Sequence, residues 1–142
     1  GSNWSASFML DGQFGHQLWN QTRRIQDIFG AGPLYDQLLR GEITQAERAR
    51  HQSIWENYVE DASFVKLRQL ALRYSTSASW LRNIGAGSMQ IELLGRNLKT
   101  WTDYSGYDPE INMFGLSTVE RGVDFAVYPN ARTYTLGVRL TY

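Results

Sequence analysis

Apolar and polar side chains alternate strictly over the last ten positions of the chain. Threonine, glycine and arginine fill every second position, and the five positions between them are aliphatic or tyrosine. These five residues are Tyr134, Leu136, Val138, Leu140 and Tyr142. Because successive side chains of a strand point to opposite faces, the pattern predicts a β-strand near 132–142 with one apolar face.

Three further segments predict strands, near 3–14, 64–74 and 87–97. The first of them alternates like the last strand over most of its length. Its apolar positions are Trp4, Ala6, Phe8, Leu10 and Phe14. The predicted connections differ in length, since those at 15–63 and 98–131 are long and the middle one is short. All three prolines fall in the long connections, where a missing N–H does not interrupt a ladder.

Part of the first long connection predicts helices. Thr44 and Glu47 have the spacing of a capping box, in which each side chain bonds the other residue's backbone N–H. The apolar stripe expected to continue this helix consists of Ile54, Trp55, Tyr58 and Val59. A shorter helix is expected from Leu34 to Arg40, ending at Gly41.

Alternation also fits a soluble β-sandwich, but the aromatic residues and the connections favour a membrane barrel. In outer-membrane barrels, aromatic rings gather at both water interfaces and the long loops lie on the outer side. Tyr134 and Tyr142 stand at the two ends of the last predicted strand, and Phe64 and Tyr74 at those of the second. The long–short–long order of connections places both long ones outside. The last strand, with its five alternating apolar residues and its aromatic end, is expected to serve as the barrel-assembly strand.

Composition narrows the function classes. The 14 basic and 14 acidic residues cancel, which argues against a nucleic-acid partner. The chain has no cysteine, so a thiolate metal site and a disulfide framework are excluded. His16 and His51 stand far apart without a metal-binding motif around either. We therefore expect no catalytic residues, no metal and no cofactor, and a chain that is not an enzyme.

Candidate contact residues gather in the third connection, where aromatic and acidic side chains lie close together in the sequence. They are Trp101, Tyr104, Tyr107 and Asp108. In a functional interpretation they form an outer-loop patch that stacks on sugar rings or contacts a lid protein. In the alternative, the loop packs on itself and covers the barrel rim.

Several segments resemble the C-terminal part of the SusC/RagA-type TonB-dependent receptors. The most specific is GRNLKTWTDYSGYDPE at 95–110, which is similar to the segment that closes the family's penultimate strand. YVEDASFVKLRQLALRYS at 58–75 resembles the entry into the third-last strand. RGVDF at 121–125 and YPNARTY at 128–134 resemble the return into the last strand.

The resemblance implies an all-β fold, an antiparallel transmembrane β-barrel fragment with long, partly helical outer loops. Residues 1–142 would supply the last four strands of a barrel of roughly 22 strands, without the plug domain. The implied function is TonB-dependent uptake of an oligosaccharide or a peptide across the outer membrane of a Gram-negative-type bacterium. The implied partners are a SusD-like surface lipoprotein, the TonB complex through the plug, outer-membrane lipid and a glycan or peptide substrate. A soluble carbohydrate-binding β-module is the alternative, and it predicts a sandwich whose apolar faces meet.

Overall fold

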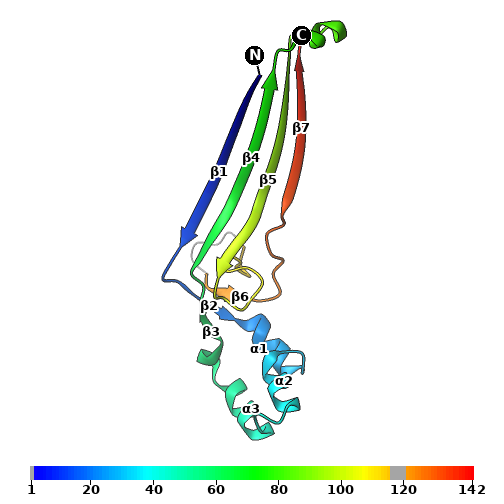
Figure 1. Ribbon diagram of the computed structural model, residues 1–142. Coiled ribbons are helices and arrows are strands. Elements are labelled where there is room, and N and C mark those ends of the chain that lie inside the picture. Colours follow the sequence, from blue (N-terminus) through cyan, green and yellow to red (C-terminus); the bar gives the residue numbers. More distant parts are fainter. Residues whose placement is uncertain (1, 116–120) are drawn as a thin grey trace. The chain divides into compact units, whose positions relative to one another are not determined.

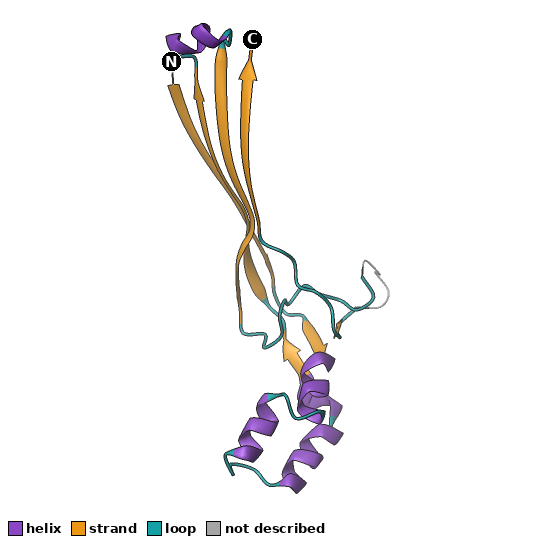
Figure 2. Cartoon of the chain, turned by 90° about the vertical axis from the view of Figure 1, so that its right-hand side faces the viewer, coloured by secondary structure: helices purple, strands orange, loops and turns teal. Residues whose placement is uncertain are grey.

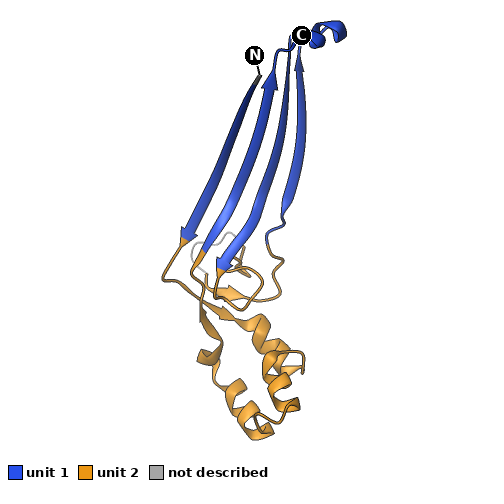
Figure 3. Ribbon diagram, viewed as in Figure 1, with its two compact units in different colours: residues 1–12, 65–101, 130–142 blue, residues 13–64, 102–129 orange. Residues whose placement is uncertain are grey.

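A computed structural model describes residues 2–115 and 121–142 of the chain. It divides into two compact units, which Figure 3 shows in different colours. Unit 1 comprises residues 1–12, 65–101 and 130–142, and unit 2 comprises residues 13–64 and 102–129. Each unit is built from segments that are distant in the sequence, so both depend on long-range contacts.

Unit 1 is a four-stranded sheet with the order β1-β4-β5-β7. Its strands are β1 (Ser2–Gln13), β4 (Phe64–Thr76), β5 (Ser88–Thr102) and β7 (Thr133–Thr141). Neighbouring strands run in opposite directions (Figure 1), so the sheet is antiparallel. These strands lie at the positions where alternation predicts them. Strands β1 and β7 form the two edges of the sheet.

The register of β5 against β7 determines which side chains share a face. Leu93 pairs with Leu136 and Ile91 with Val138, so four apolar residues lie together on one face. The residues between them point to the opposite face, where Glu92 pairs with Gly137, Gln90 with Arg139 and Leu94 with Thr135. The alternation in the sequence is therefore realised as one apolar and one largely polar face.

Strand β5 continues to Thr102, beyond the end near residue 97 that Gly95, Arg96 and Asn97 suggest in the sequence. The chain accommodates these residues within the strand because Asn97 takes a left-handed conformation, with φ of 52°. Asparagine tolerates that conformation better than most residues. The Asn97 side-chain amide also donates a hydrogen bond of 3.1 Å to the carbonyl of Ala131, which fastens the approach to β7.

The connection between β4 and β5 forms a 3-10 helix, η2 (Ser79–Ile84). Leu81 is fully buried beneath the turn. Gly85 ends the helix in a left-handed conformation, with φ of 76°. The next residue but one, Gly87, donates its N–H to the carbonyl of Thr141 at 2.7 Å, which joins the turn to the end of β7.

Unit 2 contains α1 (Gln21–Ile28), α2 (Pro33–Leu39) and α3 (Gln45–Ser53), which are among the helices coloured purple in Figure 2. The capping box of Thr44 and Glu47 at the start of α3 is confirmed, with both reciprocal hydrogen bonds present. Helix α2 also ends as predicted, immediately before Gly41, whose φ is 72°. Within the part of the chain that is described, no helix is both long and apolar enough to cross a membrane.

The prediction that α3 continues as an apolar stripe through residues 54–59 is wrong. The helix ends at Ser53, and the chain continues as η1 (Trp55–Tyr58) and β3 (Val59–Asp61). Strand β3 pairs antiparallel with β2 (Gln17–Asn20), so Val59 lies opposite Trp19. Pairing with a distant strand satisfies the backbone of this segment and overrides its helical spacing.

A second, three-stranded sheet of order β3-β2-β6 lies in unit 2 and was not predicted. Strand β6 (Val123–Asp124) pairs parallel with β2. Strands cover 42% and helices 25% of the described residues, so the fold is mostly β-sheet but less purely β than expected. The buried apolar cluster of this unit consists of Leu18, Ala62 and Tyr104, one residue from each of three segments.

Candidate functional site

The apolar face of β7 is uncovered. Every residue of the strand is exposed, including Leu136 at 68% and Val138 at 61% of their surface. Leu93, opposite Leu136, is also exposed on this face at 52%. A contiguous exposed apolar surface is unfavourable in water and is typical of a surface that contacts protein or lipid. All five residues of the predicted assembly strand belong to this region.

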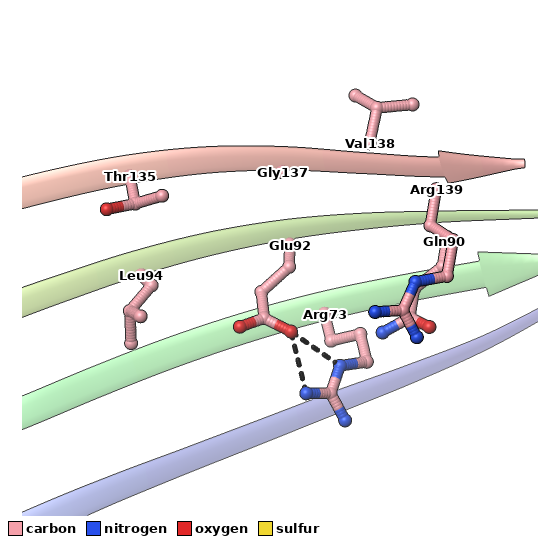
Figure 4. A pocket seen from close by; sticks show the side chains of 8 residues that line it. All are labelled: Arg73, Gln90, Glu92, Leu94, Thr135, Gly137, Val138 and Arg139. Atoms are coloured by element: carbon pink, nitrogen blue, oxygen red, sulfur yellow. Dashed lines mark hydrogen bonds and ion pairs between the residues drawn. The ribbon is translucent and has the colours of Figure 1, made fainter.

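The opposite face of the same strands carries charge. Arg73 of β4 forms an ion pair with Glu92 of β5, with its Nη2 at 2.6 Å from Oε2. Figure 4 shows these two side chains on the same side as Gln90 and Arg139, whereas Val138 points away from them. The residues line a shallow pocket of about 290 Å³. The charged side chains therefore lie on the face opposite the apolar one, as the alternation along each strand requires.

Aromatic side chains mark both ends of the sheet in unit 1. At one end, the rings of Trp4 in β1 and Tyr74 in β4 lie 4.7 Å apart. At the other end, Tyr134 begins β7 and Trp101 stands near the end of β5, exposed at 72% and 49%. Aromatic belts at the two ends of apolar strands are typical of outer-membrane barrels, where the rings lie at the lipid–water boundaries.

A polar cluster in unit 2 joins three segments that are distant in the sequence. It consists of Asn20, Arg23, Glu60 and Ser105, called here the Glu60 network. The Glu60 carboxylate accepts hydrogen bonds from Arg23 Nη1 at 3.0 Å and from Asn20 Nδ2 at 3.2 Å. The backbone N–H and hydroxyl of Ser105 donate to the same carboxylate at 2.9 and 2.8 Å. The network thus joins β2 and α1 to β3 and to the segment that follows β5.

The charge of the Glu60 network is balanced. Burial opposes ionisation of Glu60, but the hydrogen bonds from Ser105 and Arg23 outweigh it and hold the pKa of the carboxyl below its usual value. The carboxylate is therefore ionised at neutral pH and compensates the Arg23 guanidinium. The pair contributes order and hydrogen bonds to unit 2 without leaving a net charge.

A second buried interaction lies beside this network. The hydroxyl of Tyr104 donates a hydrogen bond of 2.7 Å to the Oδ2 atom of Asp124, and Thr22 donates to the Oδ1 atom at 3.0 Å. Burial raises the pKa of the Tyr104 hydroxyl, and the adjacent Asp124 carboxylate raises it further. Gly106 allows this arrangement, because a Cβ at that position would clash with the Tyr104 ring and lie 2.8 Å from Asp124 Oδ2.

The four predicted contact residues do not form one exposed patch. Trp101 belongs to β5 and not to the connection that follows. Tyr104 and Asp108 are buried, with 5% of their surface exposed in each case, and Asp108 accepts a hydrogen bond from the N–H of Glu110. Of the four residues, Tyr107 is the one that lies in that connection with an exposed ring, at 69% exposure. The physical reason is that Tyr104 and Asp108 fill the interior of unit 2.

Sequence reasoning missed Asn20, Arg23 and Glu60. Their partners are 40, 37 and 45 positions away, and no local spacing signals such pairings. Among residues 2–115 and 121–142, no three histidine or acidic side chains converge where they could hold a metal ion. The arrangement offers hydrogen bonding and surface contact.

Comparisons with known proteins agree on one class. No family model matches the chain. The TonB-dependent receptor P3 of Formosa agariphila is 36% identical over 97 residues, which cover 66% of this chain and 10% of that protein. The TonB-dependent receptor P39 of the same organism is 28% identical over 153 aligned positions, covering 96% of this chain and 14% of the relative.

Solved structures show the same relationship in the fold. The RagAB peptide importer in its open-open state matches 98% of this chain with a TM-score of 0.73 at 24% identity. In its closed-closed state it matches 96% with a TM-score of 0.71 at 25% identity. The match takes in 16% and 15% of those chains, and the chain spans about a tenth to a seventh of the curated relatives it matches. In sequence and in fold, the chain thus belongs with the SusC/RagA-type TonB-dependent receptors and corresponds to a C-terminal portion of them.

Proposed function

We propose that the chain forms part of the wall and outer loops of a TonB-dependent nutrient transporter in the bacterial outer membrane. Unit 1 would supply the last four of roughly 22 barrel strands. The observation that carries the proposal is the division of β5 and β7 into an exposed apolar face and a charged face. In a barrel, the apolar face contacts hydrocarbon and the charged face lines the aqueous lumen.

The physical argument rests on solvation. Transfer of the leucine and valine side chains exposed on β7 from water to lipid is favourable, by about 25 cal/mol for each Å² of apolar surface removed from water. Strands β1 and β7 also lie at the sheet edges, where their outer N–H and C=O groups require partners. A membrane does not tolerate open edges, so further strands of the same receptor are required on both sides.

The proposal includes partners beyond this chain. A plug domain elsewhere in the receptor would fill the lumen and respond to TonB. A SusD-like lipoprotein would cover the outer loops and deliver the substrate. The similar RagAB structure is that of a peptide importer. For this chain the substrate is proposed to be an oligosaccharide or a peptide. No catalytic step and no nucleic-acid partner form part of the proposal.

The soluble carbohydrate-binding module is the second candidate, and the exposures argue against it. That candidate requires the apolar face of the sheet to be buried against a second layer. Leu136 and Val138 are instead more than half exposed. No observation on unit 1 favours the sandwich.

Cysteine accessibility in the full receptor tests the proposal. The chain has no cysteine, so Val138→Cys and Arg139→Cys introduce single labelling sites here, adjacent in sequence and on opposite faces. After spin labelling in outer-membrane vesicles, the label at 138 should collide mainly with oxygen and the label at 139 mainly with a water-soluble nickel chelate. Equal accessibility of both labels to the nickel chelate would refute the assignment of the faces.

A further inference from the structure

A small pocket opens in unit 2 between the beginning of α1 and the turn that follows β5. Its volume is about 250 Å³. Arg23 and Gln26 line it from α1, and Tyr107 and Pro33 contribute its apolar surfaces. The ring of Tyr107, a candidate from the sequence for stacking on a sugar ring, therefore lies in one pocket with polar residues of a distant segment.

One wall of the pocket is fixed in place by interactions already described. Asn20, Arg23 and Ser105 line the pocket and are held by hydrogen bonds to Glu60. Gly106, in the same lining, leaves no room for a side chain, because a Cβ there would clash with the Tyr104 ring and with the Asp124 carboxylate. Because these side chains are already ordered, a ligand that binds against them does not incur the entropic cost of ordering them, which favours affinity.

Polar groups in the pocket are left with free hydrogen-bonding capacity. The side-chain amide of Gln26 has no hydrogen-bond partner among the described residues, and it can both donate and accept. Arg23 uses its Nη1 atom for Glu60 and Ser105, and its Nη2 atom has no partner in the described part of the chain. These two groups can therefore bond a ligand without breaking a bond within unit 2.

The charge balance of the pocket discriminates between ligand classes. Arg23 lies 3.0 Å from the Glu60 carboxylate, so the guanidinium offers N–H donors without a net positive charge. A carboxylate ligand would meet the ionised Glu60 close behind Arg23, and an ammonium ligand would meet Arg23 itself. An uncharged ligand rich in hydroxyl groups avoids both penalties. The exposed Tyr107 ring can stack on a ligand ring that presents C–H groups on one face. The amide of Gln26 and the guanidinium of Arg23 can bond hydroxyl groups at the edge of that ligand ring.

We propose that this pocket binds one uncharged sugar residue of a glycan, with Tyr107 stacked on the apolar face of the sugar ring and Gln26 and Arg23 bonded to its hydroxyls. The inference rests on the proposed transport function and names the substrate class for it. The volume suits one ring of a longer chain, so the pocket acts as a single subsite on the outer side of the receptor.

Calorimetric titration of the purified full receptor tests the pocket. The probes are maltohexaose, cellohexaose and mannohexaose as neutral glycans, with hexagalacturonate and a pentapeptide mixture as the charged alternatives. We expect a neutral glycan to bind, Tyr107→Ala to weaken its binding about five- to tenfold, and Tyr107→Phe to stay within about twofold, since the ring and not the hydroxyl supplies the stacking. Gln26→Ala should weaken binding about threefold, as expected for one lost hydrogen bond.

Tyr128→Ala is the matched control, because Tyr128 is exposed at 93% in the same unit and does not line the pocket. It should leave binding of the neutral glycan unchanged. The proposal is overturned if no neutral probe binds the unmodified receptor, if Tyr107→Ala and Tyr128→Ala bind equally well, or if Tyr107→Ala weakens only the peptide or the galacturonate. Uptake of nutrients by cells carrying Tyr107→Ala is measured in parallel. A receptor that imports normally but binds no neutral glycan contradicts the subsite alone, whereas a receptor that imports nothing in unmodified form contradicts the transport function.

Discussion

Replacing Leu136 by arginine places a charge in the middle of the apolar face of β7. Leu136 is the fourth of the nine residues of this strand and lies opposite Leu93. If this face contacts hydrocarbon, the arginine lies near the bilayer midplane, where it destabilises an outer-membrane barrel by about 2–4 kcal/mol. Such a loss is a large fraction of the ordinary stability of a folded protein.

The same substitution would cost far less if the face were exposed to water. The Leu136 side chain is 68% exposed in unit 1, so arginine there meets no steric obstacle within the unit. A substitution at an exposed site in water changes stability by about 0.5 kcal/mol or less. The loss in the free energy of unfolding caused by Leu136→Arg is therefore expected to be severalfold larger in lipid than in water. Thr135→Arg is the matched control, because Thr135 lies on the opposite face with Leu94 as its partner.

The assay is the urea midpoint of the full receptor folded into phospholipid vesicles, followed by tryptophan fluorescence. Leu136→Arg should lower the midpoint strongly and reduce the folded fraction in outer membranes, while Thr135→Arg should behave like the unmodified receptor. Equal midpoints for the two variants would show that β7 has no lipid-facing side. A larger loss for Thr135→Arg would show that the two faces are assigned the wrong way round.

Four further predictions concern unit 2 and use the same unfolding assay. Tyr104→Phe removes the donor to the buried Asp124 carboxylate and should cost about 1–3 kcal/mol; an unchanged midpoint would contradict the role of this bond. Gly106→Ala should be destabilising by about 1–3 kcal/mol, since its Cβ would crowd the Tyr104 ring and the Asp124 carboxylate; an unchanged midpoint would contradict this close packing. Thr44→Ala removes an N-cap and should cost about 1 kcal/mol, with reduced helical signal in circular dichroism. Because the pKa of Glu60 is lower in the folded than in the unfolded chain, its stabilisation is present above the unfolded value of about 4.3 and is lost as the pH falls through the folded value. A Glu60→Gln variant should lose less stability over that acid range, and identical acid profiles would contradict the assignment.

Local signals in the sequence predicted a substantial part of the fold. The capping box at Thr44 and Glu47 and the end of α2 before Gly41 depend on residues within one or two turns, and both are present. Strands β1, β4, β5 and β7 likewise follow from alternation within each segment. Such features are predictable because the residues that cause them are neighbours in the chain.

The remaining features depend on pairing across the chain. Strands β2, β3 and β6 have four, three and two residues, too few for a recognisable alternation. The apolar stripe after α3 failed as a helix for the same reason, since pairing of Val59 with Trp19 decides its conformation. Within the candidate contact segment, the sequence could not show that Tyr104 is buried and that Tyr107 is exposed.

By itself, the sequence determined which side chains share a face of each long strand, because a strand alternates with a period of two residues whatever surrounds it. It also determined the class of receptor, through the segment at 95–110. The tertiary structure alone decided that Arg23, Gln26 and Tyr107 line one pocket and that Glu60 neutralises it. Electrostatic balance and burial depend on distances between segments 37 or more residues apart, which no local pattern encodes.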